Sequence, residues 1–465
     1  MNAVSGPARS QPKLSVRPSP PAELLVRGAR LLDPRAGIDG AHDLLLRDGE
    51  VAEIGEPGAL EPGAAEVIEG ERLHVFPGFV DPHVHLPTPG REDEEDIESG
   101  TRAAAAGGFC CVLAMPNTEP VVDTASVLRA LHERAGEEAR VAVGFLAAIT
   151  RDQAGTDLTE MAELADDGAV GFSDDGMPIE RARVMRQALQ YQRLSGRVLA
   201  LHEEDRSLSG AGMMHEGAIS TLLGLAGIPS ISESTAVERD IAIARYEEGR
   251  CHMLHLSAAE SVDAVERAKA EGLAVTAEAT PHHLILTDEW VQSLDPRFKM
   301  NPPLRGDGDR RRLVEGLRSG AIDCVATDHA PHSREEKEDS FEQAPMGVTG
   351  LETAFSALYS ELVVPGTLSL ELLVERMSAG ASVYGLPLPS LAKGSVANLC
   401  LVDLDAEWRV GETGYESRSE NSCFAGQTFQ SRVLVTVAAG AVAYRERGFA
   451  IRLADAALTG GRGRR

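Results

Sequence analysis

Long apolar runs and excess positive charge are both absent from this sequence. No uninterrupted apolar run approaches the roughly 18 residues that a membrane-spanning helix needs, so no such helix is expected. The first residues include basic side chains but lack the apolar core of a secretory signal. Lys and Arg number 45 against 72 Asp and Glu, which gives a formal net charge of −27 at pH 7. This charge repels phosphate groups, so neither nucleic acid nor an anionic membrane is expected as a partner.

Cysteine is scarce, and no CxxC pair occurs, which argues against a structural zinc ribbon. Four of the six cysteines lie in apolar runs, and the adjacent Cys110 and Cys111 would point to opposite faces of a strand. Buried free thiols are therefore expected in place of a disulfide framework, and a reducing cytoplasm is the expected location. The six cysteines are Cys110, Cys111, Cys251, Cys324, Cys400 and Cys423.

Composition separates the two ends of the chain from its middle. Residues 1–21 are rich in Pro, Ser and Arg and predict a disordered arm, and residues 456–465, which close in GGRGRR, predict a flexible tail. Residues 22–74 and 393–455 have strand-like patterns, with Asp48-Gly49 as a hairpin turn signal in the first segment. Because domain termini often lie close together, we expect the two segments to meet as one small sheet or β-sandwich.

Residues 75–392 alternate between strand-like and helical segments. Strands joined by helical crossovers pair in parallel, and eight such units close a barrel. The expected fold is therefore α/β, a (β/α)8 TIM barrel with a small β-sandwich domain formed by the N- and C-terminal segments. The strand-like runs are residues 75–85, 109–116, 140–149, 169–175, 197–204, 250–257, 273–280 and 322–329.

The stretch PGFVDPHVHL, residues 77–86, is the first indication of chemistry. His83 and His85 are two residues apart, so on a strand their imidazoles point to the same side and can share a zinc-class ion. Further histidines and carboxylates end other strand-like runs, where the active sites of such barrels lie. Two divalent ions need about this many donors if one carboxylate bridges them. The candidate ligands are His83, His85, Asp175, His202, His255 and Asp328.

From about Pro77 to Ala392, and in the flanking β segments, the chain resembles a class I dihydroorotase of the amidohydrolase superfamily. The matching motifs are PGFVDPHVHL, EEDIESGTRAAAAGGF, MPNTEP, GAVGFSDDG, TAEATPHHLILTD, MNPPLR, TDHAPHSREEKE and GLETA. The resemblance implies a metal-dependent hydrolase with the six candidates as ligands of two Zn²⁺ ions. It implies Asp175 and a hydroxide as the bridges between the ions.

Many relatives in the superfamily bridge their metal ions with a carboxylated lysine from the fourth strand. No lysine lies between Lys13 and Lys269, so the sequence excludes that arrangement here. Of the adjacent Asp174 and Asp175, only one can face the barrel mouth, because neighbours on a strand alternate. The family match selects Asp175, and Asp174 is left as a helix-cap candidate.

The implied reaction is the reversible closure of N-carbamoyl-L-aspartate to L-dihydroorotate in the de novo synthesis of the pyrimidine UMP. In the hydrolytic direction a metal-bound hydroxide attacks the ring amide carbonyl, and Asp328 carries the proton from water to the leaving nitrogen. The ions also polarise that carbonyl and stabilise the oxyanion.

The family also implies residues that contact the substrate, and two other segments need an interpretation. Residues 333–349 form either a loop over the site or a solvated surface loop, and His282 and His283 are assigned to structure. The implied substrate-binding residues are Asn117, Asn301 and His332, with backbone groups of Met346 and Gly347.

One position departs from the family pattern. The family reads HxHLREPG or HxHFREPG, and its arginine binds the substrate carboxylate, whereas this chain reads HVHLPTPG. Pro87 therefore stands in place of the arginine and Thr88 in place of the glutamate. Proline offers no donor for a bidentate contact with a carboxylate. Arg91 lies in the same loop, and we hypothesise that it reaches inward instead.

Two other functions remain open beside an active dihydroorotase. One is a related cyclic amidohydrolase, of the hydantoinase, dihydropyrimidinase or allantoinase kind, which acts on another cyclic ureide. The departure at Pro87 favours it, and the Asp bridge and the long motifs oppose it. The other is a non-catalytic partner of aspartate transcarbamoylase, which the retention of all six ligand candidates opposes. A homodimer and a complex with aspartate transcarbamoylase are both compatible with the acidic surface.

Overall fold

Eight parallel strands in the middle of the chain form the barrel that carries the site. The computed structural model describes residues 10–449 of the 465-residue chain. Each of the eight strand-like runs expected from the sequence contains one barrel strand. The barrel strands are β6 (Phe79–Val84), β7 (Phe109–Ala114), β8 (Ala142–Phe145), β9 (Gly171–Ser173), β10 (Val198–Leu201), β13 (Cys251–Met253), β14 (Val275–Ala279) and β15 (Cys324–Val325).

Two parallel bridges close the strands into a ring. The strands pair in the orders β6-β7-β8 and β9-β10-β13-β14-β15. The bridge between Ala147 and Phe172 joins β8 to β9, and the bridge between Val84 and His329 joins β6 to the segment after β15. Asp81 on β6 strengthens the second seam, because its carboxylate accepts from the backbone N–H of Thr327 at 3.1 Å and from its hydroxyl at 2.6 Å. The expected TIM barrel is confirmed.

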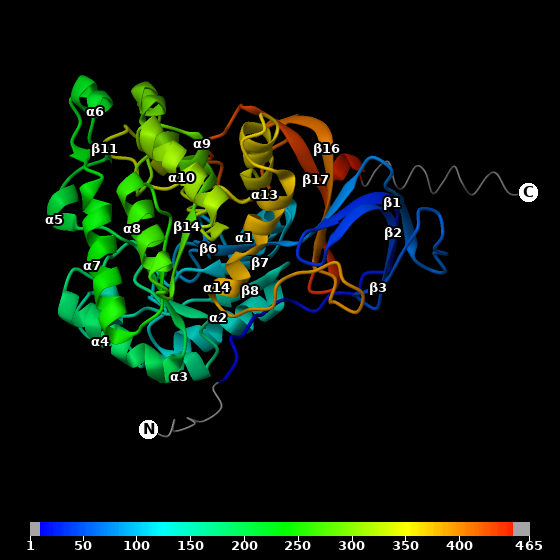
Figure 1. The fold of residues 1–465 in the computed structure, drawn as a ribbon, viewed down its shortest axis with the longest axis horizontal. Helices are drawn as coiled ribbons and strands as arrows, with labels where there is room; N and C mark the ends of the chain where they lie inside the picture. The colour runs from blue at the N-terminus through cyan, green and yellow to red at the C-terminus, as the bar shows by residue number, and fades with distance from the viewer. Residues whose placement is uncertain (1–9, 450–465) are drawn as a thin grey trace, which may run out of the picture.

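Helices cover the outside of the barrel and connect its strands (Figure 1). The helix after β6 begins at a capping box in which the side chain of Asp96 accepts from Ser99 N at 2.7 Å. The chain then turns into β7 through Gly107, where a Cβ atom would lie 2.0 Å from the carbonyl oxygen of Leu351, and through Gly108 at φ +90°. The helices that follow the eight barrel strands and cover them are, in order, α1 (Ile97–Ala106), α2 (Ala125–Glu138), α3 (Met161–Asp166), α4 (Ala182–Ser195), α7 (Ile231–Glu247), α8 (Ala259–Ala270), α10 (Asp307–Ser319) and α13 (Leu370–Ser378).

The remaining helices are short and lie in the connections of the second half of the barrel. Two of them follow β10, one follows β14 and three follow β15, and α6 projects at the end of the molecule in Figure 1. They are α5 (Arg206–Ser209), α6 (Ala218–Leu223), α9 (Pro281–Ile285), α11 (Arg334–Lys337), α12 (Ala354–Leu358) and α14 (Gly380–Val383), with the small β11 (Met214–His215) and β12 (Gly227–Ile228) pair.

The two terminal β segments meet beside the barrel, where the blue and orange strands of Figure 1 lie together. They form one eight-stranded sheet in the order β18-β17-β16-β5-β1-β2-β3, with β4 paired to β1. The expected β-sandwich is thus a single continuous sheet in its hydrogen bonding. Its strands are β1 (Leu24–Asp33), β2 (Ile38–Arg47), β3 (Glu50–Gly55), β4 (Glu66–Glu69), β5 (His74–Pro77), β16 (Leu399–Arg409), β17 (Thr428–Ala438) and β18 (Ala441–Arg445).

Turn chemistry fixes the register of this sheet. Asp48 and Gly49 have φ values of 51° and 75° and join β2 to β3, so the hairpin turn predicted there is confirmed. Ala439 and Gly440 have φ values of 48° and 79° and join β17 to β18 in the same way. Both turns supply the positive φ values that match the twist of the strands.

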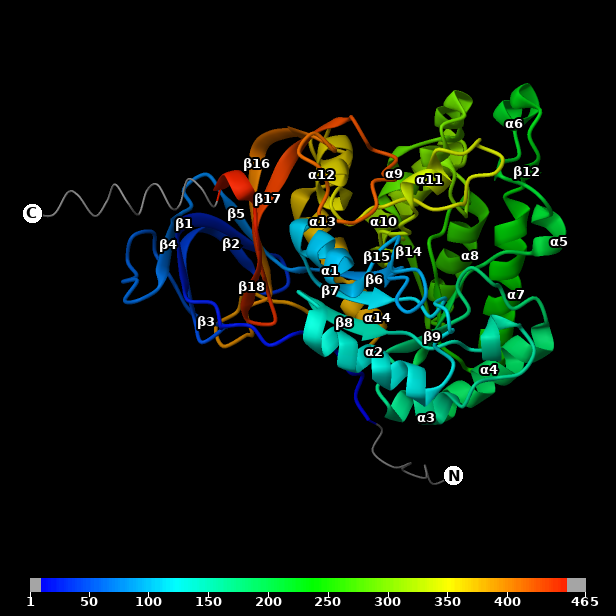
Figure 2. The same cartoon turned by 180° about the vertical axis from the view of Figure 1, so that it is seen from behind.

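The prediction of a disordered arm is wrong for residues 10–21. Ser15 forms an antiparallel bridge with Val143 of β8, with N–O distances of 2.9 and 2.8 Å. Lys13 N donates to Gly168 O at 3.0 Å and Arg17 N donates to Ala139 O at 3.1 Å. In Figure 2 this segment runs beside α2. The polar composition of the arm hid these backbone contacts, which do not depend on apolar side chains.

Other expectations from composition have mixed outcomes. All six cysteines are buried and free, as expected. The flexible tail expected at residues 456–465 lies outside the described residues. Among helices of residues 10–449, none is long and apolar enough to cross a membrane.

The contact between the arm and α2 can be tested by the pH dependence of the stability of the protein. His132 of α2 is buried with its Nδ1 2.9 Å from Ser15 Oγ, and burial, helped by the charge of Lys13, lowers its pKa to about 4. An unfolded chain protonates its histidines near pH 6.5, so this contribution to stability is present above pH 6.5 and is lost as the pH falls toward 4. Urea unfolding should therefore show a smaller loss of stability between pH 7 and pH 5 for His132→Gln than for the unmodified protein. Equal losses would contradict the assignment.

Candidate metal centre

The six candidate ligands lie together at the C-terminal ends of the barrel strands. His83 is the next-to-last residue of strand β6, His85 comes directly after this strand, and His202 comes directly after β10. Asp175, His255 and Asp328 follow β9, β13 and β15 by two or three residues. Parallel strands end at one rim of a barrel, so residues spread over more than two hundred positions converge there.

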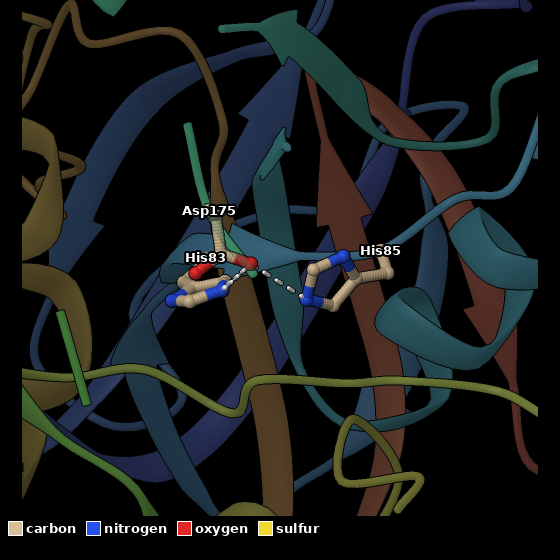
Figure 3. Close-up of side chains that lie close together, drawn as sticks. All are labelled: His83, His85 and Asp175. Atoms are coloured by element: carbon tan, nitrogen blue, oxygen red, sulfur yellow. Dashed lines mark ion pairs between the residues drawn. The ribbon is translucent and has the colours of Figure 1, made fainter. Parts of the chain in front are cut away.

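Asp175 lies at the centre of this cluster. Its Oδ2 is 3.5 Å from His83 Nε2 and 3.4 Å from His85 Nε2, and Figure 3 shows this oxygen between the two rings. Its Oδ1 faces the other pair, at 3.4 Å from His202 Nδ1 and 3.4 Å from His255 Nε2. Each oxygen of one carboxylate therefore serves a different pair of imidazoles.

Asp328 completes the first pair. Its Oδ1 is 3.1 Å from His85 Nε2 and 3.4 Å from His83 Nε2. The backbone of Asp328 has φ 49° and that of His255 has φ 29°, a left-handed region that non-glycine residues rarely adopt. Local backbone strain of this kind concentrates at functional sites, where the surrounding structure enforces it.

The donor set fits metal cations. The buried atoms His83 Nε2 and Asp175 Oδ1 have no hydrogen-bond partner. Burial opposes the charge of His83, but the carboxylates of Asp175, Asp328 and Glu278 raise its pKa well above the usual value. The site thus attracts positive charge and points unpaired nitrogen and oxygen atoms at it, which is what a divalent ion requires.

Carboxylates that sequence reasoning missed orient these ligands. Glu278 on β14 accepts from His83 Nδ1 at 2.7 Å, which leaves Nε2 of that ring free for a cation. Its other oxygen is 2.9 Å from His252 Nε2. Although burial opposes its ionisation, the charge and hydrogen bonds of the two histidines lower the pKa of Glu278 to about 2. The sequence feature that could have indicated Glu278 is its position as an acidic residue inside the otherwise largely apolar strand VTAEA.

Asn117 has a contact beyond its expected role. Its Oδ1 lies 2.9 Å from His85 Nδ1 and accepts that N–H, so it fixes the orientation of a candidate ligand. Asn117 also lines the cavity at the rim, so the same side chain can orient His85 and contact a molecule bound in the cavity.

A cavity of about 410 Å³ opens over the cluster. It contains all five residues expected to bind substrate, together with Asp328 and three of the four candidate histidines. Its lining comprises His85, Pro87, Arg91, Glu94, Asn117, Asp175, Gly176, His202, His255, Asn301, Asp328, Ala330, Pro331, His332, Met346 and Gly347. The metal candidates and the substrate candidates therefore share one cavity.

Buried lysines hold the segment that was expected to form a loop over the site. Lys337 Nζ donates to the carbonyls of Pro345 at 2.9 Å and Gly347 at 2.8 Å. Lys299 Nζ donates to Ala344 O at 2.7 Å, and burial lowers the pKa of Lys337 to about 7. With Met346 and Gly347 in the cavity wall, these contacts support the interpretation as a loop over the site.

Arg91 reaches the cavity, as the sequence hypothesis required, and so does Pro87. The side chain of Arg91 is half-exposed, and its Nη2 is 2.9 Å from Glu94 Oε1 and 2.8 Å from Glu336 Oε1. Glu94 is also 3.2 Å from His332 Nδ1. Arg91 is the only Arg or Lys among the residues that line this cavity.

Two further expectations concern neighbours of the ligands. Asp174 is not a helix cap: it accepts from Ile149 N at 2.8 Å and from Thr150 N at 3.0 Å, and so fixes the loop after β8. His283 is bonded to Thr280 Oγ1 and to Pro302 O, in keeping with a structural role. His282 is buried, which lowers its pKa to about 4, and its Nε2 has no hydrogen-bond partner.

Comparison with known proteins gives the family. A family model described as dihydro-orotase-like matches residues 72–261. A dihydroorotase of Anaeromyxobacter dehalogenans (strain 2CP-C) is 45% identical over 426 residues, which cover 91% of this chain and 98% of the relative. A dihydroorotase of Pelotomaculum thermopropionicum is 42% identical over 426 residues, which cover 91% of this chain and 99% of the relative.

Solved structures agree on the architecture. An L-hydantoinase (dihydropyrimidinase) from Arthrobacter aurescens superposes with a TM-score of 0.80 at 27% identity and covers 90% of this chain and 96% of that structure. A dihydropyrimidinase from Brevibacillus agri NCHU1002 gives a TM-score of 0.78 at 23% identity over 90% of this chain and 95% of that structure, a likeness of fold alone. Together with the identity to curated relatives over nearly their whole length, these findings show that the chain belongs to the dihydroorotase family.

Proposed function

We propose that this protein is an active dihydroorotase that interconverts N-carbamoyl-L-aspartate and L-dihydroorotate. The observation that carries the proposal is the single cavity that joins the six-residue cluster to the five expected substrate residues. Membership of the family supports the reaction, and the intact donor set opposes a non-catalytic role. The substrate belongs to the small polar cyclic ureides, which a cavity of about 410 Å³ accommodates.

We propose two zinc ions as the resident metals. His83, His85 and Asp328 would hold one, His202 and His255 would hold the other, and Asp175 would be shared. The support is that the ligand atoms of each triad with Asp175 lie within 4.8 Å of one another. When bound, such ions lower the pKa of water and polarise a carbonyl oxygen.

Asp328 is proposed as the proton carrier. Its carboxylate lies at the cavity edge with Oδ1 3.1 Å from His85 Nε2, and the charges of His83 and His85 hold its pKa below the usual value although burial opposes this. It is therefore ionised and able to take a proton from water and return it to the leaving ring nitrogen.

Arg91 is proposed to bind the carboxylate of the substrate in place of the missing arginine at Pro87. Glu94 and Glu336 hold its guanidinium at the cavity wall, while its half-exposed side chain leaves donors for a second anion. A guanidinium has five N–H donors, so two glutamate contacts do not exhaust it. Asn117, Asn301 and His332, with the backbone of Met346 and Gly347, would contact the ureido and ring groups.

Asp328→Asn separates proton transfer from metal binding. We expect kcat to fall by about 10²- to 10⁴-fold in both directions, because the amide cannot carry the proton. Zinc content, measured by elemental analysis, should remain close to that of the unmodified protein because four histidines and Asp175 persist. A variant that keeps its kcat would refute the proton-carrier role, and zinc removal that leaves activity unchanged would refute the metal dependence.

Arg91→Ala tests substrate identity. A lost charge-assisted contact is worth about 1.5–3 kcal/mol, so KM for dihydroorotate should rise about tenfold or more with little change in kcat. Arg129→Ala, which removes an exposed arginine paired with Asp167, should leave KM unchanged. The same assay should include hydantoin and dihydrouracil, which lack the carboxylate. Preference for either over dihydroorotate would favour the related cyclic amidohydrolase, the alternative that Pro87 supports.

A further inference from the structure

We propose that Glu204 is a positioning residue that joins the metal centre to the substrate-binding amide of Asn301; the inference rests on the proposed function. Glu204 follows β10, two residues after His202. Its Oε2 lies 3.3 Å from His202 Nε2 and 3.1 Å from Asn301 Nδ2. One carboxylate oxygen therefore contacts a candidate ligand on one side and a candidate substrate contact on the other.

The contact with His202 determines which nitrogen faces the cation. An ionised carboxylate only accepts hydrogen bonds, so His202 Nε2 carries the proton and donates it to Glu204. The unprotonated Nδ1 then faces the centre, where it lies 3.4 Å from Asp175 Oδ1 and 3.0 Å from His255 Nε2. His83 and His85 have the opposite arrangement, with Nε2 toward the centre. His83 and His85 donate their other ring N–H to Glu278 and to Asn117. His202 needs an equivalent acceptor on the side of its ring that faces away from the centre, and Glu204 provides it.

The contact with Asn301 determines the orientation of its amide. Nδ2 donates to Glu204, which leaves Oδ1 as the amide atom available to accept an N–H of a ureido group. Asn301 lines the cavity, whereas Glu204 is not among the lining residues. Glu204 therefore acts through Asn301 and His202 and does not itself contact the substrate.

A short helix fixes Glu204 in turn. Ser209, the last residue of α5, donates its hydroxyl to Glu204 Oε1. Asp205 caps the start of α5 by accepting from Ser207 N at 2.9 Å. The Glu204 side chain is 12% exposed, so this carboxylate is held in one place with both oxygens engaged. A fixed acceptor is what a positioning role requires.

The adjacent Glu203 is a matched control. It is buried, its Oε1 has no hydrogen-bond partner, and its charged neighbours are Asp240, Arg239, His202 and Glu233. Neighbouring residues at a strand end point to opposite sides, so Glu203 faces α7 while Glu204 faces the centre. Glu203→Gln therefore makes the same chemical change beside His202 but removes no hydrogen bond to His202 or Asn301.

The experiment compares Glu204→Ala, Glu204→Gln and Glu203→Gln in the full chain, with zinc affinity from chelator competition and KM for dihydroorotate. Loss of a group that orients a ligand typically weakens metal binding about 10- to 100-fold, and we expect this for Glu204→Ala, together with a raised KM. Glu204→Gln keeps an acceptor for His202 and should recover most of the zinc affinity. Glu203→Gln should match the unmodified protein in both measurements.

Zinc affinity and KM unchanged in Glu204→Ala would overturn the inference, as would equal losses in Glu204→Ala and Glu204→Gln. If Glu204→Ala does not fold, Glu204→Asp replaces it with the same expectation, because the shorter side chain withdraws the acceptor. The outcome is separable from the proposed reaction. An unmodified protein inactive on dihydroorotate would refute the proposed function, while the zinc affinities would still decide the role of Glu204.

Discussion

The carboxylate of Asp175 stands between two pairs of imidazoles in a buried part of the barrel rim, and this anion governs the arrangement around it. Its oxygens lie 3.4–3.5 Å from ring nitrogens of four histidines that arrive on three different strands. A buried carboxylate is costly unless positive charge surrounds it. Burial opposes ionisation, yet the charge of His83 and the hydrogen bonds of the neighbouring rings keep the pKa of Asp175 well below its usual value. The site is organised to attract cations.

Neutral and acidic groups behind the ligands set their orientation. Glu278, Asn117 and Glu204 each accept from the nitrogen that a histidine turns away from the centre. The same three groups tie the ligands to different parts of the molecule: a barrel strand, the loop after β7 and the loop after β10. Ligand geometry is therefore a property of the whole rim, which explains why residues that touch no substrate are expected to affect it.

The sequence was sufficient for the barrel and for the candidate ligands because both depend on local patterns. Strand and helix alternation is a local signal, and His83 with His85 is a two-residue spacing that a strand converts into a shared face. The acceptors were missed because their function depends on pairings across the fold. Nothing local to Glu204 indicates Asn301, 97 positions away. Residues 10–21 were misjudged for a related reason, since their backbone pairs with β8 regardless of composition.

The terminal sheet pairs a strand from the C-terminal part of the chain with the strand that leads into the barrel. Strand β16 pairs with β5, which leads within two residues into β6 and its His83. During synthesis β5 emerges more than three hundred residues before β16, so one edge of it has no partner for most of translation. Unpaired strand edges recruit other chains, and domains with such long-range pairing fold late. A ribosome-bound chain that ends before β16 would therefore expose this edge of β5 until β16 has been synthesised.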